Sequence, residues 1–110
     1  MPMDESIAAR IRREVNNYSG VVEKKMFGGI GFIVNGNMAC GVNGSDLIVR
    51  VGPQKSEQAL SHPFTGLFGM MSKSPNAGWV KVSPEGFASE QELRDWVKQG
   101  MDFALTLPPK

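Results

Sequence analysis

Two Asn-Gly pairs, Asn35-Gly36 and Asn43-Gly44, limit most strongly what this chain can fold into. Each pair lies between runs of apolar and β-branched residues, and residues that tolerate positive φ in that setting are the strongest short-range signal for a β-hairpin. With the runs on either side, the pairs predict four antiparallel strands in a meander, at about residues 21–27, 30–35, 38–42 and 47–51. A later run at 78–83 predicts a fifth strand.

Helical patterns flank and interrupt these strands. Over residues 4–18 the apolar positions recur on one face at 100° per residue, and residues 53–60 suit a short helix that begins at a proline. Ser89 followed by Glu92 is a capping box that opens a final helix, whose apolar stripe contains Gly100. Glycine costs about 1 kcal/mol in a helix relative to alanine. We therefore expect the backbone of this helix to approach the sheet at Gly100.

The order α-β-β-β-β-α-β-α predicts one α+β domain over residues 1–110. We expect a two-layer α/β sandwich with a five-stranded antiparallel meander sheet and the helices on one face. The chain is 41% hydrophobic and 21% charged, which is ordinary for a globular protein, and no window approaches the ~18 apolar residues of a membrane span. The N-terminal residues lack the apolar run of an export signal, so a cytoplasmic location is expected.

Three glycines, Gly28, Gly29 and Gly31, follow the basic pair Lys24 and Lys25 and at first suggest a phosphate-binding loop. Such a loop lies between a strand and the N-terminus of a helix, whose N–H groups hold the phosphate. Here the glycines lead into the alternating run IGFIVNGNM, which predicts another strand. We therefore interpret them as the entrance to a hairpin, and we expect no nucleotide or other cofactor.

Residues that could perform catalysis or bind a metal are few. One cysteine, Cys40, and one histidine, His62, are too few for an ordinary zinc site. They are also the only pair from which a nucleophile and a base could be assembled. Because Cys40 falls in the middle of a predicted strand, we expect a buried small apolar side chain rather than a nucleophile. The sequence thus predicts neither an enzyme nor a metal site.

The charge balance disfavours nucleic acid as a direct partner. The net charge is +1, whereas nucleic-acid binding modules usually carry a concentrated basic field. Lys24, Lys25, Arg50 and Lys81 could rim an anionic pocket if the fold gathered them. Solvated lysines at a strand edge are the favoured alternative.

Strand alternation divides the apolar residues between two faces of the predicted sheet. With a two-residue turn in Asn35–Asn37, Phe32 shares a face with Ile48 and Arg50, whereas the face that contains Cys40 is purer in apolar residues and is expected to lie under the helices. The first face would then be exposed and would mark a partner surface around Phe32, Ile48 and Arg50. Alternatively, the loop that contains residues 64–71 folds over it.

That loop is itself a candidate binding surface. It contains Phe64, Phe68, Met70 and Met71, and methionine side chains repack easily against different partners. A buried flap made from the same residues is an equal alternative.

Three segments carry a resemblance to a known family: KKMFGGIGFIVNGNMACGV, LIVRV, and GWVKVSPEGFASEQELRDWVKQGMDFA. They resemble the N-terminal domain of the TfoX (Sxy) family of bacterial competence regulators, over nearly the whole chain. The resemblance implies an antiparallel α/β domain similar to the secretion-chaperone-like fold, a cytoplasmic protein, and no known catalytic residue. The competence regulators add a C-terminal helical domain that this sequence lacks, so we expect a stand-alone version.

From the residues and the resemblance together we expect a non-enzymatic regulatory or protein-interaction domain. It would act as a homodimer or on another protein, without a membrane. The alternative is a nucleic-acid-linked accessory module in transcription or competence regulation.

Overall fold

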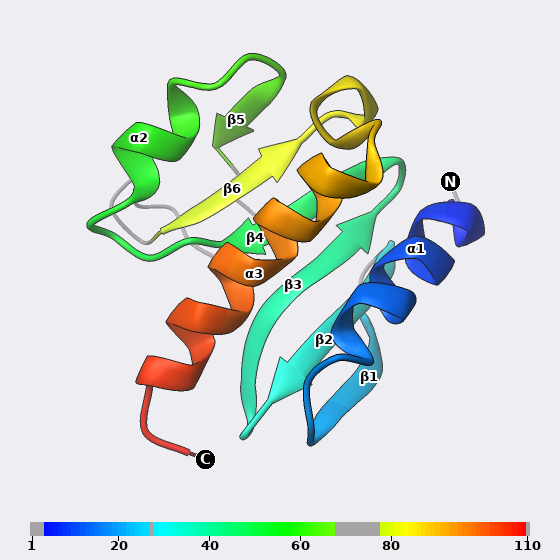
Figure 1. Ribbon diagram of the computed structural model, residues 1–110, viewed down its shortest axis with the longest axis vertical. Helices are drawn as coiled ribbons and strands as arrows, with labels where there is room; N and C mark the ends of the chain where they lie inside the picture. Colours follow the sequence, from blue (N-terminus) through cyan, green and yellow to red (C-terminus); the bar gives the residue numbers. More distant parts are fainter. Residues whose placement is uncertain (1–3, 27, 68–77, 110) are drawn as a thin grey trace.

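The computed structural model describes residues 4–26, 28–67 and 78–109, and within them six strands form one antiparallel sheet in the order β1-β2-β3-β4-β6-β5 (Figure 1). The elements are α1 (Glu5–Val15), β1 (Val21–Met26), β2 (Gly29–Val34), β3 (Asn37–Asn43), β4 (Asp46–Arg50), α2 (Ser56–Leu60), β5 (Thr65–Leu67), β6 (Trp79–Val82), the 3₁₀ helix η2 (Pro84–Phe87) and α3 (Glu90–Thr106). None of the described helices is long and apolar enough to cross a membrane.

This architecture confirms the predicted α+β class, with the first four strands in a meander and β6 beside β4. The predicted count of five strands is wrong, because Thr65–Leu67 forms β5 and pairs with β6 at the edge of the sheet. Three residues are too short to show strand alternation. The sequence therefore predicted only a loop there.

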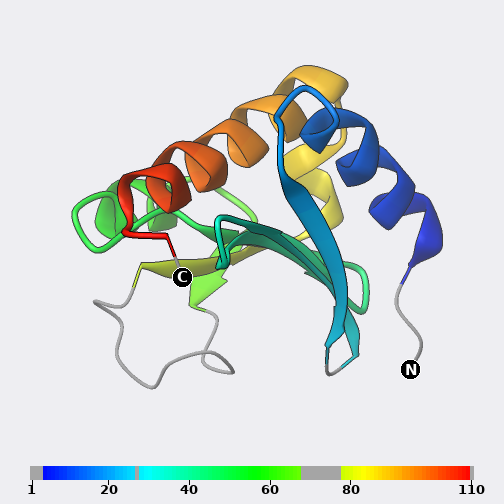
Figure 2. The ribbon, with the colours of Figure 1, turned by 90° about the horizontal axis from the view of Figure 1, so that it is seen from below.

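Helices α1 and α3 cover the same face of the sheet (Figure 2). The predicted capping box of α3 is present: the Ser89 hydroxyl accepts from the Glu92 backbone N–H and the Glu92 carboxylate accepts from the Ser89 N–H, both at 3.0 Å. Gly100 lies directly over β3, where an added Cβ would collide with the carbonyl oxygen of Ala39. The close approach of α3 to the sheet at Gly100 is therefore confirmed.

A β-bulge at Ala39 decides which side chains of β2 face the helices. The hairpin turn is Asn35-Gly36, with φ of 54° and 81°, and it pairs Ile33 with Met38 as expected. One residue further on, Phe32 pairs with Cys40 instead of Ala39. A shift of one residue moves every following side chain to the opposite face.

The predicted placement of Phe32 beside Ile48 and Arg50 is therefore wrong. Phe32 shares the helix-covered face with Cys40 and is 1% exposed, in the hydrophobic core. The bulge lets the aromatic ring fill the space under the helices and places Gly31 on the opposite face of the sheet, in register with Gly41 and Ile48. The other large side chains of the sheet that are fully buried are Val34, Leu47, Val49, Val80 and Val82.

The glycines that first suggested a phosphate loop belong to the β1–β2 hairpin. Gly28 has a φ of +69° in the turn, and Gly29 pairs with Met26 across it. An added Cβ at Gly29 would collide with the carbonyl oxygen of Val42 on β3. Since a strand and not a helix follows these glycines, the hairpin interpretation is confirmed.

Candidate functional site

An exposed aromatic ring lies at the turn that connects α2 to β5. Phe64 is 52% exposed and has a φ of +67°, a region that bulky L-residues rarely occupy and that costs about 1–3 kcal/mol. Hydrogen bonds on both sides hold the turn: the Ser83 N–H donates to the Phe64 carbonyl at 2.8 Å, and the Thr65 hydroxyl donates to the His62 carbonyl at 2.7 Å. The strained backbone conformation thus directs a large apolar side chain toward solvent.

Beside this ring is a pocket of about 350 Å³ with an aromatic wall. The Trp96 indole N–H donates to the Gly86 carbonyl at 3.1 Å, and the His62 ring packs edge-on against Trp96, with the ring centroids 5.5 Å apart. Two carboxylates from the first half of α3 complete the wall. We call this the Phe64 surface, formed by His62, Pro63, Phe64, Gly86, Glu92, Asp95, Trp96 and Gln99.

The other predicted partner residues are placed differently. Ile48 is 2% exposed, and Phe32 lies in the core. Phe68, Met70 and Met71 lie outside the described residues, so neither the binding-loop nor the buried-flap interpretation of them is tested. Of the residues proposed from sequence, Phe64 is therefore the one that the described structure shows as an exposed apolar side chain.

Arg50 is enclosed by aromatic rings at the end of β4. Its guanidinium carbon lies 5.3 Å from the centroid of the Trp79 ring and 5.5 Å from that of the Phe103 ring. Its Nε is buried and has no hydrogen-bond partner among the described residues. Such cation–π contacts contribute about 0.5–2 kcal/mol each. Arg50 thus helps to fix the two rings in place.

The four basic residues proposed to rim one anionic pocket are spread over the sheet. Cross-strand pairing runs from Lys24 through Gly31, Gly41 and Ile48 to Lys81. Four strand spacings separate the two lysines, which corresponds to roughly 19 Å. One small anion cannot contact both, so the described fold does not form that pocket.

Cys40 and His62 are also not brought together. Cys40 is completely buried in β3, and burial raises the pKa of its thiol to about 12. His62 is exposed and contacts Trp96 instead. Among the described residues, no group of three or more histidine, cysteine or acidic side chains is placed to hold a metal ion.

Sequence reasoning missed the role of two residues at this surface. Trp96 falls in the apolar stripe of α3, and nothing in its spacing indicates that its indole edge lines a pocket. The positive φ of Phe64 was equally hidden, because phenylalanine has no preference for that backbone region. The Pro63 that precedes it and the apolar character of the loop were the available signals.

A small antiparallel α+β domain with a helix-covered sheet and an exposed aromatic surface is the class that these features define. Comparison with known families matches residues 14–104 to the TfoX N-terminal domain, a stretch that includes all six described strands. The chain therefore belongs to the TfoX N-terminal domain family, as the resemblance indicated. No curated protein and no solved structure matches it.

Proposed function

We propose that this domain acts in regulation by binding another protein through the Phe64 surface, and that it performs no catalysis itself. The observation that supports the proposal most directly is the conformation of Phe64, an exposed aromatic residue at positive φ. A backbone outlier of this kind persists only when the surrounding contacts enforce it, and such outliers are concentrated at functional sites. Exposed aromatic side chains beside a pocket are also the usual anchors of protein interfaces.

The charge of the surface indicates the chemistry of the partner. Glu92 and Asp95 lie next to Trp96 and Phe64, and the described lining contains no lysine or arginine. A protein segment with an apolar anchor flanked by lysine or arginine would match both the ring and the acidic wall. We therefore propose a partner with a basic, amphipathic contact segment.

A second copy of this chain matches the surface less well. In a symmetric dimer the same patch lies on both sides of the contact, so Glu92 and Asp95 of two chains would face each other and repel. Homodimer formation, which the sequence suggested, is thus proposed only as the alternative assembly. Sedimentation velocity at micromolar concentrations distinguishes the two, because the proposal predicts a monomer.

Cys40 is relevant to the cellular compartment in which the domain acts. It is a free buried cysteine in the described structure, which suits the reducing conditions of the cytoplasm. We propose the cytoplasm as the place of action, in agreement with the family resemblance.

Site-specific photo-crosslinking tests the proposal. A photoreactive phenylalanine derivative is introduced at position 64, and the matched control places it at position 105, where Leu105 is 46% exposed on α3. We expect a discrete protein adduct from position 64 that position 105 does not give. The change Asp95→Lys should weaken the adduct by reversing a charge in the acidic wall. Equal adducts at both positions, or an adduct that nuclease removes, would contradict a protein partner at this surface.

A further inference from the structure

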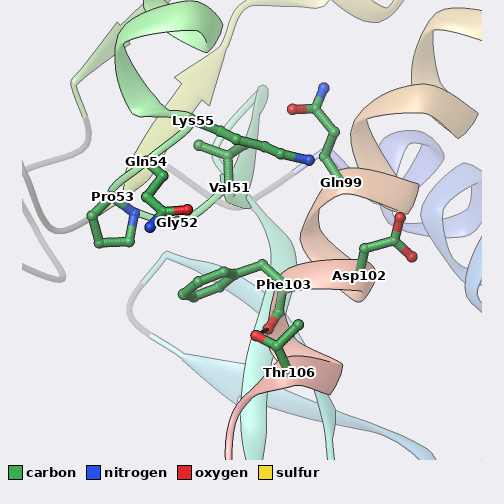
Figure 3. Close-up of a pocket in the computed structure, with 9 residues that line it drawn as sticks. All are labelled: Val51, Gly52, Pro53, Gln54, Lys55, Gln99, Asp102, Phe103 and Thr106. Atoms are coloured by element: carbon green, nitrogen blue, oxygen red, sulfur yellow. Dashed lines mark hydrogen bonds between the residues drawn. The ribbon is translucent and has the colours of Figure 1, made fainter.

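A second pocket, of about 470 Å³, lies between the loop after β4 and the second half of α3 (Figure 3). Gly52, Pro53 and Lys55 contribute from the loop, and Gln99 and Phe103 contribute from the helix. The volume lies within the range of natural small-molecule sites, which combine an apolar wall with a few convergent polar groups. Among the described residues, its lining shares Gln99 alone with the pocket at the Phe64 surface.

The apolar wall of this pocket is fixed before any ligand arrives. Gly52 has a φ of +93°, and the Phe103 ring lies 2.6 Å from the position that a Cβ at Gly52 would occupy. The Arg50 guanidinium holds the same ring at 5.5 Å and is itself in contact with Trp79. Because the ring is already positioned, a planar ligand that packs on it need not reorganise the site.

The polar groups of the pocket differ in whether they are free to bind a ligand. The Asp102 carboxylate accepts a hydrogen bond from the Lys98 ammonium group at 2.6 Å, and the Thr106 hydroxyl donates to the Phe103 carbonyl at 2.6 Å. Lys55 forms no ion pair among the described residues, and its side chain extends across the pocket toward Gln99 (Figure 3). One free ammonium group therefore remains, beside an amide that can donate and accept hydrogen bonds.

We propose that this pocket binds a small carboxylate with an aromatic or apolar body. The carboxylate would pair with Lys55, the body would pack on Phe103, and Gln99 would hydrogen-bond to a polar group between them. A single lysine balances one negative charge, whereas a phosphate monoester carries a charge near −2 and would stay partly unbalanced here. The ligand is either a free organic acid or the C-terminal residue of a peptide, since both offer the same chemistry.

N-acetylphenylalanine and its uncharged amide form a matched pair of probes. Titration into ¹⁵N-labelled protein, followed by amide chemical shifts, should give a dissociation constant of about 1 mM for the acid. The shifted amides should be those of residues 51, 52, 54, 55 and 99–106, since Pro53 has no backbone N–H. The amide probe should bind about tenfold more weakly, as should the acid to Lys55→Gln, because either change removes one charge-assisted hydrogen bond.

A cycle of two probes and two proteins isolates the proposed contact. Lys55→Gln should leave binding of the amide probe unchanged, and Lys81→Gln, a change of an exposed lysine on β6, should alter neither affinity. Lys55 is exposed and its side chain forms none of the hydrogen bonds found among the described residues, so its replacement should not affect folding.

A short peptide that ends in phenylalanine, with a free or an amidated C-terminus, identifies the source of the ligand. Tighter binding of the free peptide than of N-acetylphenylalanine favours a peptide C-terminus, and weaker binding favours a free acid. The proposal is overturned if the pocket amides do not shift at millimolar probe. Equal affinities for acid and amide, or an unchanged affinity in Lys55→Gln, would also overturn it.

Discussion

Replacing Gly100 by alanine should destabilise this domain, although the same change stabilises most helices. On an exposed helix, alanine is favoured over glycine by about 1 kcal/mol. At Gly100 the new Cβ would collide with the Ala39 carbonyl oxygen and would lie 3.3 Å from a methyl carbon of Val49. A backbone oxygen cannot rotate away, so α3 would have to lift from the sheet.

The magnitude follows from these opposing terms. Overpacking a core typically costs 1–3 kcal/mol of stability. We take about 3 kcal/mol, the upper end of that range, because the contact is with backbone that cannot move aside. Subtracting the gain in helix propensity leaves a net loss of about 2 kcal/mol, which lowers the melting temperature by about 8 °C in a domain of this size.

Urea and thermal unfolding followed by circular dichroism measure this change. The matched control is Gly66→Ala on β5, where the added Cβ would meet the flexible side chain of Lys81, at 3.3 Å, and no other described residue. Its stability should stay within about 0.5 kcal/mol of the parent protein. A Gly100→Ala protein as stable as the parent, or more stable, would refute the close approach of α3 to the bulge at Ala39.

Three further predictions concern the core, the free thiol and one surface ion pair. Phe32→Ala should lower the free energy of unfolding, measured in urea, by about 3–5 kcal/mol. Val22→Ala, at a position that is 60% exposed, should change it by less than about 0.5 kcal/mol. Equally small effects of the two changes would contradict the burial of Phe32. Cys40 should resist iodoacetamide in the native protein at pH 8 and react only on unfolding, because its pKa is raised to about 12 by burial; rapid native labelling would contradict this. The hydrogen bond from Arg12 lowers the pKa of Glu23 in the folded protein. The pair should therefore add about 0.5 kcal/mol to the stability of the fold at pH values above the unfolded pKa of glutamate, about 4.3. This contribution should be lost as the pH falls through the lower pKa of Glu23 in the folded protein. Glu23→Gln should therefore narrow the stability difference between pH 7 and pH 3, and an unchanged difference would be evidence against the pair.

The parts of the fold that local chemistry determines could be predicted from the sequence. Asn-Gly pairs specify tight hairpins whatever surrounds them, and Ser89 with Glu92 specifies where α3 begins. The approach of α3 at Gly100 was also predictable, because a glycine within an apolar helical stripe needs a packing reason.

The bulge at Ala39 was not predictable, and it changed the interpretation of β2. Turn chemistry fixed the pairing of Ile33 with Met38, but the side on which Phe32 lies depends on how the helices fill the core, which is a tertiary effect. The same limit applies to the candidate site. The Phe64 surface joins a loop, η2 and α3, and no spacing within the sequence indicates that these segments meet.

The change Phe64→Gly tests the central claim most directly, because glycine accepts the positive φ without strain while it removes the ring. Unfolding stability and affinity for the crosslinked partner are measured on the same preparation, with Leu105→Gln as the matched control. The account predicts stability within about 1 kcal/mol of the parent protein and an affinity lower by at least about thirtyfold, as expected for an interface anchor. An unchanged affinity would contradict a role for Phe64 in binding, and a loss of stability that accompanies the loss of affinity would show that the residue serves the fold instead.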